Sequence, residues 1–309
     1  MTTPSKAANR PGGEWLLAGH PVARIGYGAM QLVERPGLPP VDADDAIALL
    51  HRVVELGITH IDTAEFYGHG TANDLIRRAF GDSDEVVIVS KVGANRVDAP
   101  VPLVAAQKPQ ELRASIEANL RSLGRDRIAV VNLRRADAQP GIIATGDQVV
   151  DLDDQLAELA ALRDEGLIGA FGLSNVSLEQ LQQALPAGIA CVQNSYSLVE
   201  RSGERMLDLC RANDIAWAPF FPLGSAFPGR PKVVEQPAVL AAAQQLGVTP
   251  SQVGLAWMLQ HAPNTLLIAG TSSIAHLEQN AAIGDITLSD DLMAQLDAVS
   301  ADGKQTSIG

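Results

Sequence analysis

Three side chains of complementary chemistry lie close together in the first third of the chain. Asp62 and Tyr67 are five residues apart, and Lys91 follows in the next apolar segment. A free phenol has a pKa of about 10. A neighbouring ammonium favours the phenolate and lowers that pKa, and a carboxylate paired with the ammonium holds it in place and charged. The three residues therefore predict a tyrosine that acts as a general acid near neutral pH.

The segments that must position these residues alternate between short β-rich runs and longer runs with helical periodicity. Eight β runs are expected, at residues 24–31, 60–63, 86–91, 128–133, 169–173, 190–194, 215–219 and 265–268. Helices are expected at residues 42–56, 71–80, 109–123, 153–165, 178–185, 201–213, 236–246, 250–261 and 274–283. Residues 15–25 read as a hairpin around Gly19 and His20. Alternating β and α segments require parallel strands joined by right-handed crossovers.

Eight such units predict an α/β fold of the (β/α)8 TIM-barrel class, with an N-terminal β-hairpin and extra C-terminal helices. The alternative is an open doubly wound sheet, which normally has a glycine-rich first turn, and residues 26–30 (GYGAM) lack the third glycine. We expect a single domain over residues 14–309 and a flexible N-terminus at residues 1–13. Long loops at residues 94–108 and 139–150 would border the mouth of the barrel, where loops select substrates.

Chemistry in such a barrel takes place at the carboxyl ends of the strands. Seven polar residues are expected there: Asp62, Tyr67, Lys91, Arg134, Ser174, Asn175 and Gln193. Their convergence on one mouth predicts a functional site. The sequence contains no G-x-S-x-G, P-loop or H-E-x-x-H motif. Hydrolase, nucleoside triphosphatase and metalloprotease interpretations thereby lose their usual support, and we expect no metal site.

The composition limits the classes of function. The 309 residues carry a formal net charge of −13, which repels phosphate backbones and anionic membranes, so nucleic acid and membranes are disfavoured as partners. The two cysteines, Cys191 and Cys210, suit a reducing compartment. The sequence shows neither an apolar run of about 18 residues nor a secretory signal, and we expect a soluble, cytoplasmic protein.

Five segments resemble motifs of the aldo-keto reductase family. They are residues 57–68 (GITHIDTAEFYG), 86–93 (VVIVSKVG), 172–175 (GLSN), 192–196 (VQNSY) and 270–273 (GTSS), the last followed by Asn280. The resemblance implies a barrel that reduces the carbonyl of a small molecule to an alcohol with NAD(P)H. Hydride delivery leaves an alkoxide, and Tyr67 would protonate it with the help of Asp62 and Lys91. A monomer and a small homo-oligomer both stay open.

One position departs from the family pattern. The family normally places a histidine at the end of the fourth strand to hydrogen-bond the substrate carbonyl, and residues 128–135 (IAVVNLRR) put Arg134 there. An arginine is a permanent cation with a fork of donors. At ~6 Å and an effective dielectric of about 20, one charge contributes roughly 3 kcal/mol, or about two pKa units. Arg134 could lower the pKa of Tyr67 further and bind an anionic group of the substrate.

The resemblance also implies which residues hold the cofactor. Ser174, Asn175 and Gln193 would bind the nicotinamide carboxamide, and Phe220 would stack on its ring. Backbone amides of the turn at Leu223 and Ser225 would bind the pyrophosphate. A phosphate cradle at a helix N-terminus is expected from Gly270, Thr271, Ser272 and Ser273. The other residues expected at the cofactor are Gly28, Ala29, Met30, Asp62, His276, Gln279 and Asn280.

The cofactor and the substrate class are predicted less directly. No lysine or arginine lies within residues 270–273, but hydroxyls and backbone amides can bind a phosphate, so we expect NADPH ahead of NADH. Residues 220–224 (FFPLG) and 270–273 most resemble bacterial pyridoxal reductases, also called pyridoxine 4-dehydrogenases. The absence of the histidine keeps a second hypothesis open, a nicotinamide-binding sensor or interaction subunit with little turnover. A reductase of a secondary-metabolite sugar or polyketide carbonyl is the third.

Overall fold

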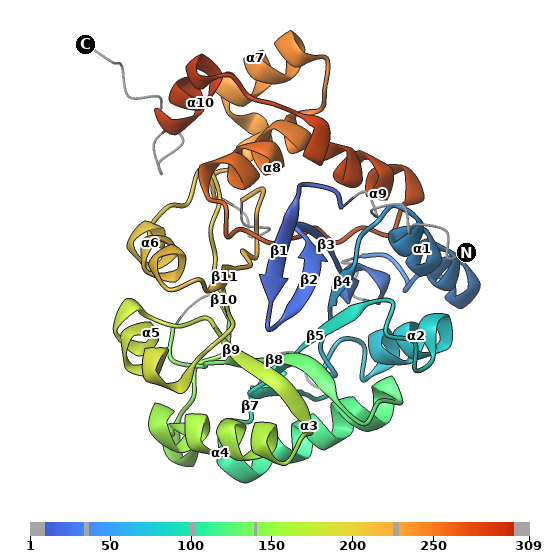
Figure 1. The fold of residues 1–309 in the computed structure, drawn as a ribbon, viewed down its shortest axis with the longest axis vertical. Coiled ribbons are helices and arrows are strands. Elements are labelled where there is room, and N and C mark those ends of the chain that lie inside the picture. Colours follow the sequence, from blue (N-terminus) through green and yellow to red (C-terminus); the bar gives the residue numbers. More distant parts are fainter. Residues whose placement is uncertain (1–9, 34–36, 99–102, 139–140, 225–228, 300–309) are drawn as a thin grey trace, which may run out of the picture.

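The computed structural model describes residues 10–33, 37–98, 103–138, 141–224 and 229–299 (Figure 1). Eight parallel strands make the central sheet: β3 (Ile25–Gly28), β4 (His60–Asp62), β5 (Val87–Val92), β8 (Ile128–Arg134), β9 (Ile168–Ser174), β10 (Cys191–Gln193), β11 (Ala216–Trp217) and β12 (Leu267–Ile268). Their order in the sheet is β11, β10, β9, β8, β5, β4, β3 and β12. Trp217 pairs in parallel with Thr265, just before β12, and this contact closes the barrel. The predicted (β/α)8 fold is confirmed.

Helices surround the strands (Figure 1). They are α1 (Ala43–Glu55), α2 (Thr71–Phe80), α3 (Pro109–Leu123), α4 (Leu152–Asp164), α5 (Leu178–Ala184), α6 (Glu204–Ala212), α7 (Pro237–Leu246), α8 (Pro250–His261), α9 (Ile274–Ala281) and α10 (Asp290–Asp297). Local sequence explains several of their ends. The Asp42 side chain accepts a hydrogen bond from the backbone N–H of Asp44 and caps α1, and Gly124 ends α3 in the left-handed region.

An N-terminal hairpin closes the amino end of the barrel. Its strands β1 (Glu14–Leu17) and β2 (His20–Ala23) pair in antiparallel fashion, as predicted. Leu17 and Val22 are buried in a cluster with Val89, Val130 and Leu266 from the barrel strands. This apolar plug keeps water out of that end of the barrel. Any chemistry must therefore enter from the opposite end, where the strands have their carboxyl termini.

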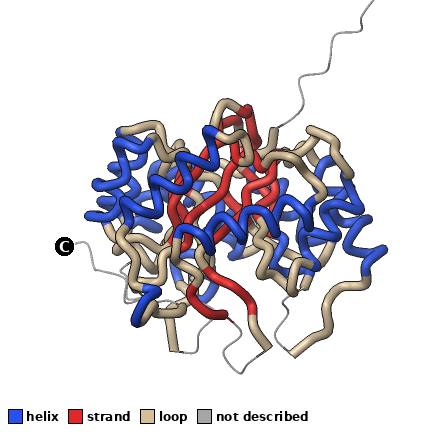
Figure 2. Tube along the Cα trace, turned by 90° about the horizontal axis from the view of Figure 1, so that it is seen from below, coloured by secondary structure: helices blue, strands red, loops and turns tan. Residues whose placement is uncertain are grey.

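The structure differs from the sequence prediction in three places. The predicted strand at residues 24–31 ends at Gly28, and Ala29–Leu32 form a turn of 3-10 helix. The loop expected at residues 94–108 contains a second hairpin, β6 (Ala94–Arg96) and β7 (Leu103–Ala105), which lies at the opposite end of the barrel from the first (Figure 2). The expected extra C-terminal helices include α10, which packs on α7 and whose bounds the sequence pattern did not predict. Such short elements are set by tertiary contacts that three or eight residues of sequence do not reveal.

Residues 1–9 of the expected flexible N-terminus lie outside the described residues, whereas Arg10 to Gly13 form a turn whose Pro11 carbonyl accepts from the N–H of Ile25 at 3.2 Å. Within the described residues, no helix has the length and apolar character needed to cross a bilayer.

A glycine and a histidine fill the barrel interior next to the apolar plug that the hairpin β1–β2 forms. Gly26 of β3 and His60 of β4 face each other so closely that a Cβ on Gly26 would collide with the imidazole ring. Burial lowers the pKa of His60 to about 4, so the ring is neutral at pH 7 and packs as an uncharged core group. His60 is 1 % exposed and thus belongs to the core of the barrel.

We predict that Gly26→Ala destabilises the fold by about 1–3 kcal/mol, because the added methyl group overpacks the interior against His60. Urea unfolding followed by circular dichroism measures the loss. Gly203→Ala is the matched control, since a Cβ there would meet Trp217 at an ordinary 3.5 Å, and its effect should stay within about 0.5 kcal/mol. Equal losses in the two variants would contradict the packing argument.

Candidate active site

A buried ion pair joins the ends of two neighbouring strands. Lys91 of β5 donates from Nζ to Oδ1 of Asp62 on β4 and, at 3.1 Å, to the carbonyl of Thr63. The other carboxylate oxygen, Oδ2, accepts from Nε2 of Gln193 on β10 at 2.6 Å. Asp62 is 3 % exposed and Lys91 is 8 % exposed. Both oxygens of the carboxylate and the ammonium thus have partners, as a buried pair of charges requires.

Tyr67 lies beside this pair. The loop after β4 turns sharply, with the N–H of Tyr67 donating to the carbonyl of Ala64 at 3.0 Å, and Phe66 packs edge-on against the tyrosine ring at 5.3 Å between centroids. The ring centroid lies 5.1 Å from Nζ of Lys91. Burial acts to lower the pKa of Lys91, but the charge of Asp62 and the contact with Tyr67 outweigh it and raise that pKa. The lysine therefore stays a cation beside the phenol at neutral pH.

A second cation, Arg134, also acts on Tyr67. It ends β8, in register with Ser174 of β9, and its side chain is half-buried. Burial lowers the pKa of the guanidinium, and the charge of Tyr67 opposes that effect. The loop after β8 lies directly against the guanidinium, because a Cβ on Gly141 would collide with it. The structure therefore brings Asp62, Lys91, Tyr67 and Arg134 together, as the sequence predicted.

The three residues expected at the nicotinamide carboxamide also lie together. Ser174 and Gln193 are paired in the sheet, and the N–H of Asn175 donates to the carbonyl of Gln193 at 3.0 Å. Asn175 has a φ of 58°, in the left-handed region that asparagine tolerates. Its side-chain amide donates to the carbonyls of Arg135 and Ala138, at 3.2 and 2.8 Å. This link to the loop after β8 was not predicted from sequence.

Residues expected at the phosphates and the adenine line one side of the mouth. Gly28 and Gly270 approach so closely that a Cβ on Gly28 would lie 2.6 Å from the carbonyl oxygen of Ile268, and one on Gly270 would lie 2.7 Å from that of Gly28. The hydroxyl of Tyr27 donates to the carbonyl of Thr271 at 2.7 Å. Ser273 caps α9 by accepting from the N–H of His276. The backbone at this rim is thus held in place with no side chain on either glycine.

The other expected cofactor residues are placed as follows. Next to Gly28, Ala29 is buried and Met30 is exposed. On α9, His276 and Gln279 are exposed and Asn280 is half-buried. Ser272, just before α9, is half-buried. Phe220 is half-buried after β11 and pairs with Ser195, and the carbonyl of Leu223 accepts from the N–H of Val233 at 3.1 Å. Ser225 lies outside the described residues.

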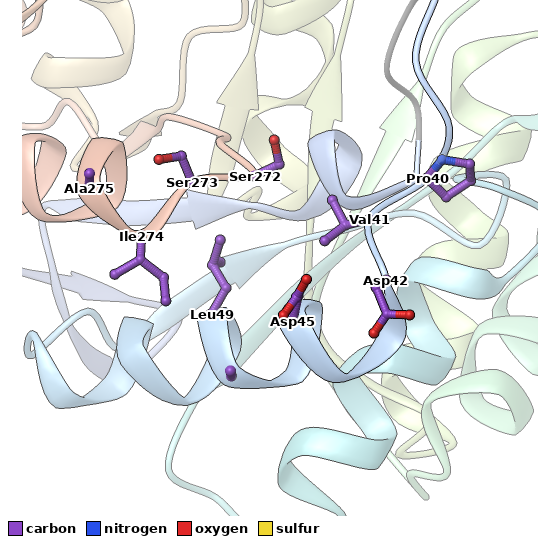
Figure 3. A pocket seen from close by; sticks show the side chains of 10 residues that line it. Pro40, Val41, Asp42, Asp45, Leu49, Ser272, Ser273, Ile274 and Ala275 are labelled. Atoms are coloured by element: carbon purple, nitrogen blue, oxygen red, sulfur yellow. The ribbon is translucent and has the colours of Figure 1, made fainter.

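A groove that the sequence did not predict adjoins this rim (Figure 3). It lies between the segment from Pro40 to Leu49, which includes the start of α1, and the segment from Ser272 to Ala275, which starts α9. The carboxylates of Asp42 and Asp45 line it beside the hydroxyls of Ser272 and Ser273. None of its lining residues belongs to the cluster around Tyr67, so it is a feature of the rim and not of the reaction centre.

The sequence of the chain matches the profile of the aldo/keto reductase family over residues 24–301. The chain belongs to this family. The pyridoxine 4-dehydrogenase of Escherichia coli is 41 % identical over 283 residues, which cover 90 % of this chain and 95 % of that protein. An uncharacterized oxidoreductase of Schizosaccharomyces pombe is 34 % identical over 281 residues, which cover 89 % and 86 %.

Solved structures agree with this membership. An aldo/keto reductase of Klebsiella pneumoniae in complex with NADP and acetate is 28 % identical, covers 92 % of this chain and 94 % of its own, and superimposes with a TM-score of 0.74. A second one from Klebsiella pneumoniae, in complex with NADPH, is 26 % identical with coverages of 96 % and 99 % and a TM-score of 0.76. This aldo/keto reductase is accordingly an oxidoreductase with the barrel of its family.

Sequence reasoning missed Asn132 in this aldo/keto reductase. It lies two residues before Arg134 on β8, in register with Lys91, and is fully buried. Strand periodicity carries the signal that could have found it, because residues two apart in a strand face the same side. The sequence prediction named only Arg134, the last residue of β8, and so did not include Asn132, which lies one layer deeper in the barrel on the same strand.

The phenol of Tyr67 should be the first to ionise in the folded protein. The chain has three tyrosines. Burial raises the pKa of Tyr27, and burial together with Glu204 raises that of Tyr196, so both stay protonated far above the usual range. Two cations favour the phenolate of Tyr67. We expect the near-ultraviolet phenolate absorbance of the folded protein to show a first titration step below the ordinary pKa of about 10. The control is Tyr67→Phe, which should lack this step; a step that persists in the variant would disprove its assignment.

Proposed function

We propose that this protein reduces the aldehyde or ketone group of a small molecule to an alcohol with NADPH, and that Tyr67 supplies the proton. The observation that carries the proposal is the buried Asp62–Lys91 pair, whose ammonium lies 5.1 Å from the centroid of the Tyr67 ring. When bound, the reduced nicotinamide supplies a hydride to the carbonyl carbon. The carbonyl oxygen then needs a proton, and a phenol next to a fixed cation is an acid of suitable strength.

The residues of the chain divide this work. Tyr67 donates its hydroxyl proton to the substrate oxygen and is left as a phenolate. Lys91 stabilises that phenolate, because its ammonium keeps its charge beside the ring. Asp62 holds the ammonium through Oδ1, and Gln193 holds Asp62 through Oδ2. Solvent returns a proton to the phenolate before the next turnover.

The residues at the mouth fit a dinucleotide. Gly28 and Gly270 let the backbones that follow β3 and β12 lie in direct contact, and this fixes the rim against which an extended ligand would lie in our proposal. In our proposal Ser174, Asn175 and Gln193 orient the carboxamide of the nicotinamide, and Phe220 packs against its ring. The phosphates would bind at Leu223, Ser225 and the segment from Gly270 to Ser273, ahead of α9. Ala29, Met30, His276, Gln279 and Asn280 complete the proposed site.

NADPH is proposed ahead of NADH. The relatives from Klebsiella pneumoniae were crystallised with NADP and with NADPH. Residues 270–273 supply hydroxyls and backbone amides instead of a lysine or arginine, and these groups can bind a phosphate. The carboxylates of Asp42 and Asp45 in the neighbouring groove weaken this preference, since they repel a phosphate that approaches Ser272 and Ser273 from that side.

Pyridoxal is the proposed substrate. The support is the identity of 41 % with a pyridoxine 4-dehydrogenase, whose name describes the reverse reaction. Pyridoxal carries a ring oxygen next to its aldehyde, and this oxygen ionises readily. Arg134 provides a permanent cation whose charge interacts with Tyr67, so a substrate with an anionic oxygen beside its carbonyl would be bound and oriented by the guanidinium while Tyr67 meets the carbonyl.

The proposed reaction is tested with purified protein, pyridoxal and NADPH, followed by the loss of NADPH absorbance. We expect turnover with a lower KM for NADPH than for NADH. Tyr67→Phe should lower kcat by about 100-fold or more, because it removes the acid, while the Kd for NADPH measured by fluorescence stays within about twofold. Failure of the wild-type protein to oxidise NADPH with any reactive aldehyde would instead favour a sensor with little turnover. Retained kcat in the variant would remove Tyr67 from the acid role.

The role of Arg134 is tested with two aldehydes of similar shape. Salicylaldehyde carries an ionisable oxygen next to its aldehyde, and benzaldehyde lacks it. We expect Arg134→Met to lower kcat/KM for salicylaldehyde by about tenfold, the equivalent of one charge-assisted hydrogen bond, and to change that for benzaldehyde much less. Arg211→Met is the control, since this arginine is exposed on α6. A large loss of NADPH affinity in Arg134→Met would show that the arginine serves the cofactor instead.

A further inference from the structure

One buried glutamine joins the ends of the two strands that carry Lys91 and Arg134. The ladder between β5 and β8 has its last pair at Val92 and Leu133, and the residues that follow, Gly93 and Arg134, are not paired in it although their backbones stay close. Nε2 of Gln107 donates to the carbonyl of Gly93 at 2.5 Å and to the carbonyl of Arg134 at 2.9 Å. This side-chain amide thus bridges the two carbonyls, and that of Gly93 also accepts from the N–H of Ala106 at 3.1 Å.

Gln107 is itself held by partners on all sides. It is 1 % exposed. Nε2 of Gln155 on α4 donates to its backbone carbonyl at 2.6 Å and to its side-chain Oε1 at 3.1 Å. Its own N–H donates to Oε1 of Gln148 at 2.7 Å. Gln155 in turn accepts from the guanidinium of Arg135, the residue next to Arg134. Because the side-chain amides of Gln107 and Gln155 are joined to each other and to further partners, Gln107 has one orientation.

The backbone is shaped to admit this amide. Gly93 has a φ of 101°, which is strained for any residue with a side chain. A Cβ at that position would collide with the carbonyl of Arg134 and would lie 2.9 Å from Nε2 of Gln107. The close approach of the β5 and β8 ends therefore depends on a glycine on one side and on the glutamine that bridges them.

We propose that Gln107 is a positioning residue that fixes Arg134 relative to Lys91, and so determines how Arg134 meets an anionic group next to the substrate carbonyl. The substrate part of this inference rests on the proposed function. Gln107 does not touch the reacting atoms and acts through the carbonyl of Arg134. Without the bridge, the end of β8 can move away from β5, and the two cations around Tyr67 no longer keep their spacing.

The test compares Gln107→Met with wild type on salicylaldehyde and benzaldehyde. Methionine has a similar length and volume but cannot donate a hydrogen bond. We expect kcat/KM for salicylaldehyde to fall by about five- to tenfold, the effect of losing one or two hydrogen bonds, and that for benzaldehyde by less than about twofold. In an Arg134→Met background the same substitution should have no further effect on this preference, as a residue that acts only through Arg134 requires.

Two controls separate positioning from general stability. Asn264→Leu removes another fully buried amide, which donates to the carbonyl of Ile215 at the amino end of the barrel, and it should lower the melting temperature without changing the substrate preference. The Tyr67 titration step should move in Gln107→Met and stay unchanged in Asn264→Leu. Gln107→Asn, which keeps the amide but is too short to span both carbonyls, provides a second variant with the same expected loss of preference if the methionine variant does not fold.

The outcomes are distinct. Equal losses on both aldehydes, with an unmoved titration step, would overturn the positioning role and leave Gln107 as a structural residue. A further loss of preference in the Arg134→Met background would also overturn it. If wild type reduces neither aldehyde, the proposed function fails, but movement of the Tyr67 step in Gln107→Met would still support the inference that the glutamine sets the spacing of the two cations.

Discussion

The ion pair between Asp62 and Lys91 is the interaction on which the site depends. Burying a carboxylate and an ammonium costs several kcal/mol for each ion, and their mutual attraction offsets this only where every remaining polar atom has a partner. The barrel supplies one partner for each ion: Gln193 of β10 for the carboxylate, and the carbonyl of Thr63, just after β4, for the ammonium. The Lys91 ammonium therefore keeps its proton beside the ring of Tyr67, although its side chain is buried.

The barrel architecture explains why this pair can exist. Parallel strands that close on themselves bring the carboxyl ends of β4, β5 and β10 to one mouth, so residues separated by 131 positions in the sequence form a direct hydrogen bond. The hairpin β1–β2 seals the other end with Leu17 and Val22. Solvent therefore reaches the ion pair from one side only, and the charges around Tyr67 act through a medium of low dielectric.

Side-chain amides connect the mouth loops to this frame. Asn175 donates to the carbonyls of Arg135 and Ala138, and Gln107 donates to that of Arg134. Each of these bonds supports the backbone around the arginine that departs from the family pattern. A guanidinium needs such support more than an imidazole does, because its long side chain has more rotamer freedom to lose. Loop anchoring and the choice of arginine are thus two parts of one arrangement.

The sequence by itself determined the fold class, the family and the members of the central cluster. Eight β runs alternating with helical periodicity predicted a closed parallel barrel ahead of an open doubly wound sheet. A carboxylate, a phenol and a lysine at predicted strand ends predicted that Asp62, Tyr67 and Lys91 meet at its mouth. Strand order follows from chain order in such a barrel, which is why residues so far apart could be placed together without coordinates.

Only the tertiary structure decided how that cluster is supported. Gln107 and Asn175 anchor loops through side chains that reach other segments of the chain, and the groove beside Ser272 lies between residues 40–49 and 272–275. The hairpin β6–β7 lies where the sequence predicted only a loop. A glutamine before a helix is an ordinary polar residue in sequence. It becomes a bridge only when the unpaired ends of β5 and β8 place two carbonyls within reach of one amide, and no local pattern encodes that distance.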